Sequence, residues 1–275
     1  MRAGRLSARG PARHLEPTFD LSLTLRSGQF FRYRPDGDGF LVVDGWRAFR
    51  IRQSGHSINL SGTTRAHAIQ LFGLDSDHKS ALAALADDPR IAPLLPDYGG
   101  LRVMRQDPWQ CLISFVCSAM SNMKRIQGNV EGIASAFGED LAGGHAFPSP
   151  RRLPRGALRP IRLGWREKYV EELFATVKEP WLGGLALKSF EEARAALMEL
   201  PGVGVKVAEC VMAFSLGFGE ACPVDVWIRR IVRRLYFGGR KTTDRALSAR
   251  MRNRFGPHTA LAQQILFAAG RDGRL

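Results

Sequence analysis

A short turn between two helix-forming runs constrains the fold of this chain most strongly. The turn reads Leu200-Pro201-Gly202-Val203-Gly204. Proline ends the first helix because it lacks a backbone N–H, and the two glycines permit a tight turn that can approach another group closely. The next helix begins at once, so its unpaired N–H groups face outward and can bind an anion such as phosphate. The pattern favours a DNA-binding hairpin of helices, with a plain helical hairpin as the alternative.

The positive charge of the chain is unevenly distributed. Its 275 residues carry 40 Lys+Arg against 26 Asp+Glu, a formal net charge of +14. Residues 225–275 hold 12 basic and 3 acidic side chains, and residues 1–14 add four arginines without an acid. A basic end on a nearly neutral body indicates a surface that meets a polyanion, first of all nucleic acid. A membrane surface fits less well, because no basic amphipathic segment carries anchoring aromatics.

Several features argue against a secreted or membrane protein. No stretch approaches the roughly 18 uncharged apolar residues of a membrane span. Residues 1–14 lack an apolar core, so we expect a disordered basic arm there, with an organellar transit peptide as the alternative. The spacing of Cys111, Cys117, Cys210 and Cys222 matches neither a zinc ribbon, an iron–sulfur cluster nor a disulfide framework. We predict reduced, buried thiols in a cytoplasmic protein.

The first part of the chain has the pattern of strands. Residues 19–25 alternate apolar and polar side chains, the period of a half-buried strand. Similar runs at 29–34, 39–44 and 46–53 are separated by Gly, Asp and Ser clusters, which is typical of antiparallel hairpins. We therefore predict a small N-terminal antiparallel β domain over residues 15–105, with short helices in its second half.

The second part of the chain has a helical period throughout. Asp107 and Pro108 open an almost wholly apolar run, which predicts a buried central helix because Asp caps helices and Pro fits their first position. Residues 140–160, rich in Gly, Pro and Arg, indicate a long connection, and a serine–glutamate capping box opens the helix before the glycine turn. We predict an all-α domain over 106–275 with a helix-hairpin-helix motif at about 189–217, and hence an α+β fold.

Two side chains near the turn have the chemistry to cleave a bond at a sugar. Lys206 lies in the first turn of the second helix, where the helix dipole disfavours a positive charge and leaves more of the amine free. A free amine can form a Schiff base with a sugar carbon. Asp225 can cap a later helix, and its carboxylate can stabilise the charge that builds on a sugar as its glycosidic bond breaks. Alone, each fits a surface lysine or a simple cap better; with the hairpin, they indicate a catalytic pair.

The segment LPGVGVKVAECVMAFSLGFGEACPVDVWIRRI resembles the helix-hairpin-helix DNA glycosylases, specifically the 8-oxoguanine DNA glycosylase/AP lyase family. The resemblance runs over about residues 19–270. It implies an enzyme that extrudes an oxidised purine from duplex DNA, with Lys206 as the nucleophile at C1′ and Asp225 as the assisting acid. A Schiff base and β-elimination would follow. It also implies a monomer that needs no metal and no organic cofactor.

The same resemblance implies a set of base-binding residues. The carbonyl of Gly28 would test for a proton on N7 of the oxidised purine. Cys210 and Phe267 would pack on the two faces of the base, and Gln263 would read its Watson–Crick edge. Gln263 and Phe267 are four residues apart and share one helix face. Without the resemblance, a buried thiol and core packing explain Cys210 and Phe267 better.

Further positions are implied to contact the DNA strands. The segment CSAMSNMKRI resembles the loop that fills the space left by the extruded nucleotide, and it includes Arg125. Trp165 corresponds to a wedge, and Arg166 to the residue that reads the opposite base. Gly202 and Gly204 belong to the hairpin that holds the backbone.

Three departures from the family pattern bear on specificity. Met120 stands where the family has Asn, with Asn122 nearby as a substitute, so strict recognition of an opposite cytosine is in doubt. Trp227 stands where the family has a phosphate-binding His, and it can stack or pack instead. Gly270 replaces an acid near the pocket. We interpret these as changes of specificity or affinity that leave the chemistry intact.

Two other functions remain open. One is a monofunctional glycosylase for alkylated bases such as 3-methyladenine, which shares the hairpin and the Asp but lacks a lysine at position 206. The other is a non-catalytic protein that binds damaged DNA. The Lys206/Asp225 pair favours the lyase over both. A protein with this function is expected in the bacterial cytoplasm at the nucleoid, or in the nucleus of a eukaryote, and is not secreted.

Overall fold

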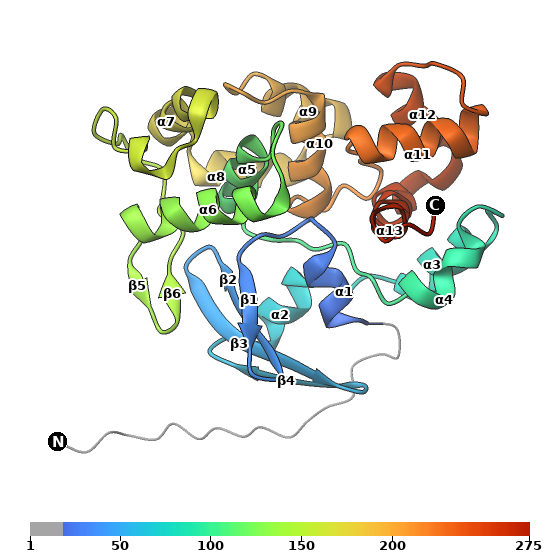
Figure 1. Cartoon of the computed structure of the whole chain (residues 1–275), viewed down its shortest axis with the longest axis horizontal. Helices are drawn as coiled ribbons and strands as arrows, with labels where there is room; N and C mark the ends of the chain where they lie inside the picture. Colours follow the sequence, from blue (N-terminus) through green and yellow to red (C-terminus); the bar gives the residue numbers. More distant parts are fainter. Residues whose placement is uncertain (1–18) are drawn as a thin grey trace.

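A four-stranded antiparallel sheet forms one end of the molecule and helices form the rest (Figure 1). This computed structural model describes residues 19–275. The strands are β1 (Tyr33–Asp36), β2 (Gly39–Asp44), β3 (Arg47–Ser54) and β4 (Ser57–Ser61), and each pairs with the next in the sequence. The predicted strands at 39–44 and 46–53 correspond to β2 and β3. The basic arm predicted for residues 1–14 lies outside the described residues.

The first predicted strand is wrong, because residues 19–25 contribute to helix α1 (Leu21–Arg26). The carboxylate of Asp20 accepts a hydrogen bond from the backbone N–H of Leu23 at 2.8 Å and caps the helix. Leu21 and Leu25 are both buried. A spacing of four residues fits a helix as well as a strand, so the alternation was ambiguous and the cap decided it.

The run at 29–34 forms a strand only from Tyr33 onward. Before it, the fully buried side chain of Gln29 forms the hydrogen bonds to residues 102–104 that a paired strand would otherwise form. Its amide donates to the carbonyl of Arg102 at 2.7 Å and to the hydroxyl of Ser27 at 2.8 Å, and its oxygen accepts from the N–H of Met104 at 2.8 Å. This segment therefore runs extended beside residues 102–104 without joining the sheet.

Three short helices follow the sheet: α2 (Arg65–Leu71), α3 (His78–Ala86) and α4 (Leu95–Tyr98). Helix α2 contributes to the apolar core beneath the sheet. By contrast, Leu85 of α3 is buried in a cluster with Ile228 and Ile265 from the end of the chain. Part of the predicted N-terminal domain thus packs with the C-terminal helices, and the domain limits at 15–105 and 106–275 stay a prediction.

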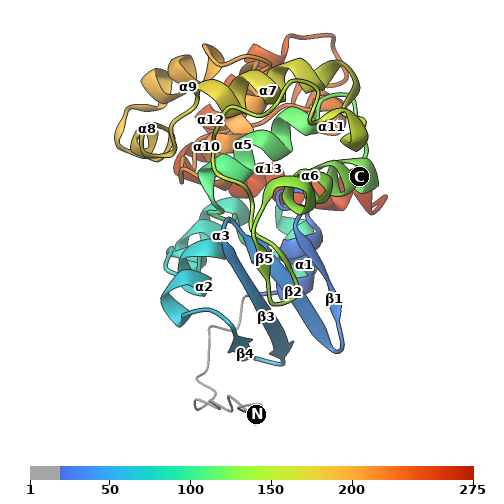
Figure 2. The ribbon, with the colours of Figure 1, turned by 90° about the vertical axis from the view of Figure 1, so that its left-hand side faces the viewer.

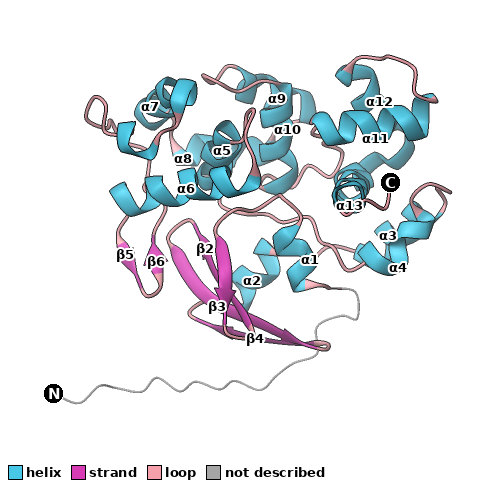
Figure 3. Ribbon diagram, viewed as in Figure 1, coloured by secondary structure: helices cyan, strands magenta, loops and turns pink. Residues whose placement is uncertain are grey.

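The rest of the molecule is mainly helical (Figure 3). Its helices are α5 (Pro108–Cys117), α6 (Met123–Phe137), α7 (Glu167–Thr176), α8 (Glu179–Gly184), α9 (Phe190–Met198), α10 (Val205–Phe214), α11 (Val226–Phe237), α12 (Asp244–Phe255) and α13 (Thr259–Arg271). As predicted, Asp107 caps α5 through the N–H of Gln110 at 2.7 Å, and every side chain from Trp109 to Cys117 is buried. The capping box at Ser189 is confirmed.

The predicted long connection at 140–160 contains a small hairpin, β5 (Asp140–Leu141) and β6 (Gly144–His145). The hairpin reaches from the helical part toward the sheet (Figure 2). Arg34 of β1 donates to the carbonyl of Gly143 at its tip, at 2.9 Å. The hairpin therefore joins the helical part to the sheet, which periodicity alone did not indicate.

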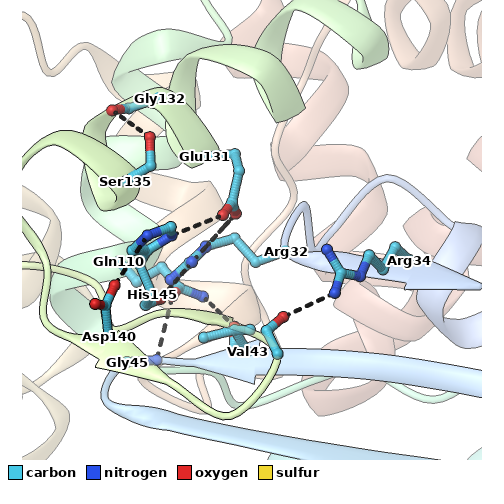
Figure 4. Close-up of polar contacts among 11 residues, drawn as sticks. Arg32, Arg34, Val43, Gly45, Gln110, Glu131, Gly132, Ser135, Asp140 and His145 are labelled. Atoms are coloured by element: carbon cyan, nitrogen blue, oxygen red, sulfur yellow. Dashed lines mark hydrogen bonds and ion pairs between the residues drawn. The ribbon is translucent and has the colours of Figure 1, made fainter. Parts of the chain in front are cut away.

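A buried arginine completes this connection (Figure 4). The guanidinium of Arg32 donates to the carbonyl of His145 at 2.6 Å, to the carboxylate of Glu131 on α6 at 3.2 Å, and to the side-chain oxygen of Gln110 on α5 at 3.3 Å. The same Gln110 oxygen accepts from the N–H of Gly45 in the β2–β3 turn at 3.2 Å. The sheet is therefore fixed against α5 and α6 by charged hydrogen bonds.

Two expectations about the chain's environment can be compared with the structure. The four cysteines are buried and free, as predicted. Among residues 19–275, no helix has both the length and the apolar character to cross a membrane.

Candidate active site

Lys206 lies in the first turn of α10, as the sequence predicts. Its half-buried amine donates a hydrogen bond to the hydroxyl of Ser118, just after α5, at 2.8 Å. The amine also lies 5.1 Å from the centre of the Phe115 ring. The packing of α10 against α5 thus holds the amine in place on one side and leaves it partly open to solvent on another.

Asp225 caps α11 and accepts a hydrogen bond from the N–H of Ile228 at 2.8 Å. Burial raises the pKa of this carboxyl, while the hydrogen bond from Ile228 and the positive charge of Lys206 oppose the rise. Within residues 19–275, the amine and the carboxylate form no direct ion pair. They are close enough for the charge of Lys206 to act on the carboxyl of Asp225.

Cys210 lies near both charged groups. It follows Lys206 by one helical turn, is 2% exposed, and has its pKa raised to about 12 by burial. The charge of Lys206 opposes this shift and that of Asp225 adds to it. The thiol is therefore neutral and apolar in character, which suits packing against a ring better than nucleophilic attack.

Gly28 and Phe267 are in contact although 239 positions separate them. Gly28 has a φ of +86°, and a Cβ built there would lie 3.0 Å from Cε1 of Phe267 on α13. Met123 of α6 lies beside the same spot, its sulfur 3.8 Å from that Cβ. The β part and the last helix thus meet here, and only glycine permits this backbone conformation and this closeness without strain.

Gln263 connects α13 to the segment that carries Asp225. Its amide donates to the carbonyl of Pro223 at 3.2 Å, and its oxygen accepts from the side chain of Gln264 at 2.9 Å. It is buried, whereas Phe267, four residues later, is half-buried. To read a base, the Gln263 side chain has to exchange these internal bonds for bonds to the ligand.

A residue that reads a base is expected to be exposed to solvent, but Arg166 is buried. It is 2% exposed, and its guanidinium donates to the carbonyls of Ala119, Met120 and Leu163. Arg166 thus holds the loop after α5 in this structure. Its predicted contact with the opposite base stays a prediction.

Three other residues that are predicted to contact the DNA strands are exposed. Asn122 caps α6 by accepting from the N–H of Arg125 at 3.0 Å, and the Arg125 side chain extends to the carbonyl of Arg162 at 3.4 Å. Trp165 is 51% exposed and packs its edge on Tyr169. Their surfaces are available to a ligand, and their contacts with DNA remain predictions.

The glycine turn has the geometry of an anion site. Gly202 has a φ of +76°, and a Cβ there would lie 2.8 Å from Cγ of Tyr169. Gly204 caps α10 without a side-chain hydrogen bond, and the N–H groups of residues 205–207 have no backbone partner among the described residues. Trp227 lies half-exposed in the first turn of α11. The turn is chemically suited to bind a phosphate, and this binding stays a prediction.

Sequence reasoning missed Ser118, the hydroxyl that holds the amine. No pattern in the sequence indicates that residues 118 and 206 meet, since the contact depends on how α5 packs against α10. The side chain of Met120, two residues later, is 92% exposed, which is unusual for a large apolar residue.

Comparison with known proteins extends these observations. Residues 14–112 match the family model for the N-terminal domain of 8-oxoguanine DNA glycosylase. N-glycosylase/DNA lyase OGG1 of Arabidopsis thaliana is 31% identical, over 93% of this chain and 78% of that protein. A probable N-glycosylase/DNA lyase of Methanothermobacter thermautotrophicus is 28% identical, over 94% and 95%. The solved structure of MBOgg1 in complex with a low-affinity DNA ligand has a TM-score of 0.89 and 30% identity, over 95% of both chains.

The fold and the geometry around Lys206 define a helix-hairpin-helix DNA glycosylase, and the predicted α+β class is confirmed. The similarity to OGG1 over most of both chains is more specific. The chain belongs to the 8-oxoguanine DNA glycosylase/lyase family.

Proposed function

We propose that this protein is a bifunctional DNA glycosylase/AP lyase that excises 8-oxoguanine from duplex DNA. One observation carries the proposal: the amine of Lys206 is held at the start of α10, within electrostatic reach of Asp225 and beside the neutral thiol of Cys210. Such a pair supplies a nucleophile and a stabilising negative charge for the same sugar. Family membership supports the choice of substrate.

In the first step the lone pair of the Lys206 amine forms a bond to C1′ as the glycosidic bond breaks. The electron pair of that bond leaves with the base, which also takes one proton from the amine. Asp225 stabilises the positive charge that develops on the sugar. Burial raises the pKa of Asp225, so the carboxyl is ionised and can play this role only when the pH lies above that raised pKa.

In the second step the sugar ring opens at O4′, which takes up a proton, and the C1′–nitrogen bond becomes a protonated Schiff base. The positive imine acidifies the proton on C2′. Loss of that proton expels the 3′ phosphate with its electron pair, which is β-elimination, and water later releases the amine. The chain supplies the nucleophile for the whole sequence, so we propose that neither a metal nor an organic cofactor takes part.

We assign the recognition of the base to the contact between the β part and α13. The base would enter between Gly28 and Phe267, with Phe267 stacking on one face and Cys210 on the other. The Gly28 carbonyl would accept the N7 proton that 8-oxoguanine carries and guanine lacks. Gln263 would bond the Watson–Crick edge. The close approach of Gly28 to Phe267 supports this assignment, and it requires the ring to move when the base enters.

We assign the contacts with the two DNA strands to exposed residues around the loop after α5 and to the glycine turn. Asn122, Arg125 and Trp165 would face the duplex. Arg166 would contribute through the loop that it holds. The exposed side chain of Met120 supports an apolar insertion in place of the family's Asn, and hence weaker preference for an opposite cytosine.

The hairpin amides at Gly202 and Gly204 would bind a phosphate, with Trp227 packing nearby in place of a histidine. The protein would work as a monomer on cellular DNA, at the nucleoid of a bacterial cell or in the nucleus of a eukaryotic one. We also propose that residues 15–105 and 106–275 act as the two sides of the base pocket.

A cleavage assay tests this function. The purified protein is incubated with end-labelled duplexes that carry one 8-oxoguanine opposite each of the four bases, and with a duplex that carries 3-methyladenine. We expect a nick at 8-oxoguanine in more than one pairing. Release of only the alkylated base without a nick would favour the monofunctional glycosylase, and binding without any cleavage would favour a damage-binding protein.

A further inference from the structure

The hydroxyl of Ser118 is bound on both sides. Its oxygen accepts a hydrogen bond from the Lys206 amine at 2.8 Å, and its own proton is donated to the carbonyl of Phe115 at 2.6 Å. A serine hydroxyl has one proton to donate. Because that proton is engaged within the end of α5, Ser118 can only accept from the amine.

This arrangement orients the nucleophile. A neutral amine has two N–H bonds and one lone pair, and the lone pair is the group that attacks carbon. When one N–H points to Ser118, the lone pair points away from Ser118. The amine is thereby prevented from using its lone pair to accept a proton from the hydroxyl, and the lone pair stays available to a sugar.

The position of Ser118 is itself fixed by its neighbours. Arg166 donates to the carbonyl of Ala119 at 2.8 Å and to that of Met120 at 3.1 Å. Met120 has a φ of +48°, a backbone conformation that residues other than glycine rarely adopt. It costs energy and persists only where the surrounding structure holds it. The guanidinium therefore keeps the loop in one shape, and Ser118 enters it at the correct place to meet the amine.

We propose that Ser118 is a positioning residue for Lys206: it holds one N–H of the amine so that the lone pair faces the sugar. The inference rests on the proposed function, since it assigns Ser118 to the same reaction. It also couples the amine to the loop that faces the DNA, because Ser118 and Met120 belong to one segment held by Arg166.

The test compares two serine-to-alanine variants, one in this loop and one outside it. Ser118→Ala removes the hydroxyl that the amine uses. Ser135→Ala is the matched control, because its hydroxyl also donates to the carbonyl three residues earlier, Gly132, but it lies on the exposed face of α6 outside the loop. Ser118→Thr restores a hydroxyl at the same carbon. Each protein is used at full length, in excess over a duplex with a preformed abasic site, and the adduct is trapped with borohydride over time.

The expected result separates rate from binding. For Ser118→Ala, the trapping rate constant at saturating enzyme should fall about tenfold, since one neutral hydrogen bond to the amine is lost. The enzyme concentration at half-saturation should stay within about twofold. Ser118→Thr should recover the rate to within about threefold, and Ser135→Ala should match the wild type.

Other outcomes overturn the proposal in distinguishable ways. If Ser118→Ala traps as fast as Ser135→Ala, the hydroxyl does not position the amine, while the proposed function stands. If Ser118→Thr is as slow as Ser118→Ala, or if Ser118→Ala loses duplex binding and melts early, the residue has a purely structural role. If the wild type forms no adduct, the proposed function itself fails.

Discussion

Asp225 serves the fold and the proposed chemistry with the same carboxylate. Asn caps helices as well as Asp does, so Asp225→Asn should keep the hydrogen bond to the N–H of Ile228 and remove only the charge. We predict that excision of 8-oxoguanine falls by about 100-fold or more while duplex affinity is unchanged. Single-turnover cleavage and a binding titration check this. Excision at the wild-type rate would remove Asp225 from the mechanism.

The same variant should reveal what the charge costs the fold. Burial raises the pKa of Asp225, against the effects of Ile228 and Lys206. An acid whose pKa is higher in the folded state binds its proton more tightly there, so the ionised form destabilises the fold and the penalty disappears as pH falls through the raised pKa. Asp225→Asn should therefore melt above the wild type at about pH 8, with a gap that closes toward about pH 4. A lower melting temperature across that range would contradict this.

Substitution of Gly28 tests the proposed base pocket. In Gly28→Ala, the new Cβ lies 3.0 Å from the Phe267 ring at a φ of +86°, so we predict a loss of about 1–2 kcal/mol of stability. Excision of 8-oxoguanine should fall strongly, whereas cleavage at a preformed abasic site, which has no base to admit, should persist. Both reactions are followed on end-labelled duplexes. An equal loss of the two would place the effect outside base recognition.

Among the structural elements, the helices were predictable where their signals are local. Helix α5 follows an Asp-Pro start, α9 a capping box and α10 the glycine turn, and each begins where the sequence indicates. Helix α1 was not predictable, because Leu21 and Leu25, four residues apart, satisfy both periods over so short a run. The hairpin β5–β6 was also missed, since four residues cannot show a period.

The elements of the site divide in the same way. The starts of α10 and α11 place Lys206 and Asp225, and both follow from local patterns. The contact of Gly28 with Phe267 joins distant segments, so residue patterns alone could not give it, and only the family resemblance pointed to it. The buried state of Arg166 depends on the packing of its loop, which neither source indicated.

The contact of α6 with the sheet should contribute measurably to stability. Glu131→Gln removes the charge that Arg32 faces, and Arg32 is buried while Glu131 is half-exposed. Because solvent screens part of the interaction, we predict a loss of about 1–2 kcal/mol in the free energy of unfolding, measured with urea. Glu172→Gln, on the exposed side of α7, is the control and should change it by less than about 0.5 kcal/mol. Equal effects would show that the ion pair adds nothing.

At the scale of the whole molecule, most of the net positive charge lies in a segment that does not contain the proposed nucleophile. The net charge of +14 comes largely from residues 225–275, which include α11, α12 and α13, whereas the proposed nucleophile is one amine on α10. Binding of duplex DNA through many basic groups should survive the loss of a single lysine. Catalysis through a covalent bond should not, because no arginine can replace the amine.

Borohydride trapping with Lys206→Gln tests this account most directly. The wild type, mixed with a duplex that carries 8-oxoguanine, should give a covalent protein–DNA band after reduction. Lys206→Gln should bind the same duplex within about threefold of the wild-type affinity and give no band. A trapped adduct in the variant would contradict the account, because another amine would then be the nucleophile.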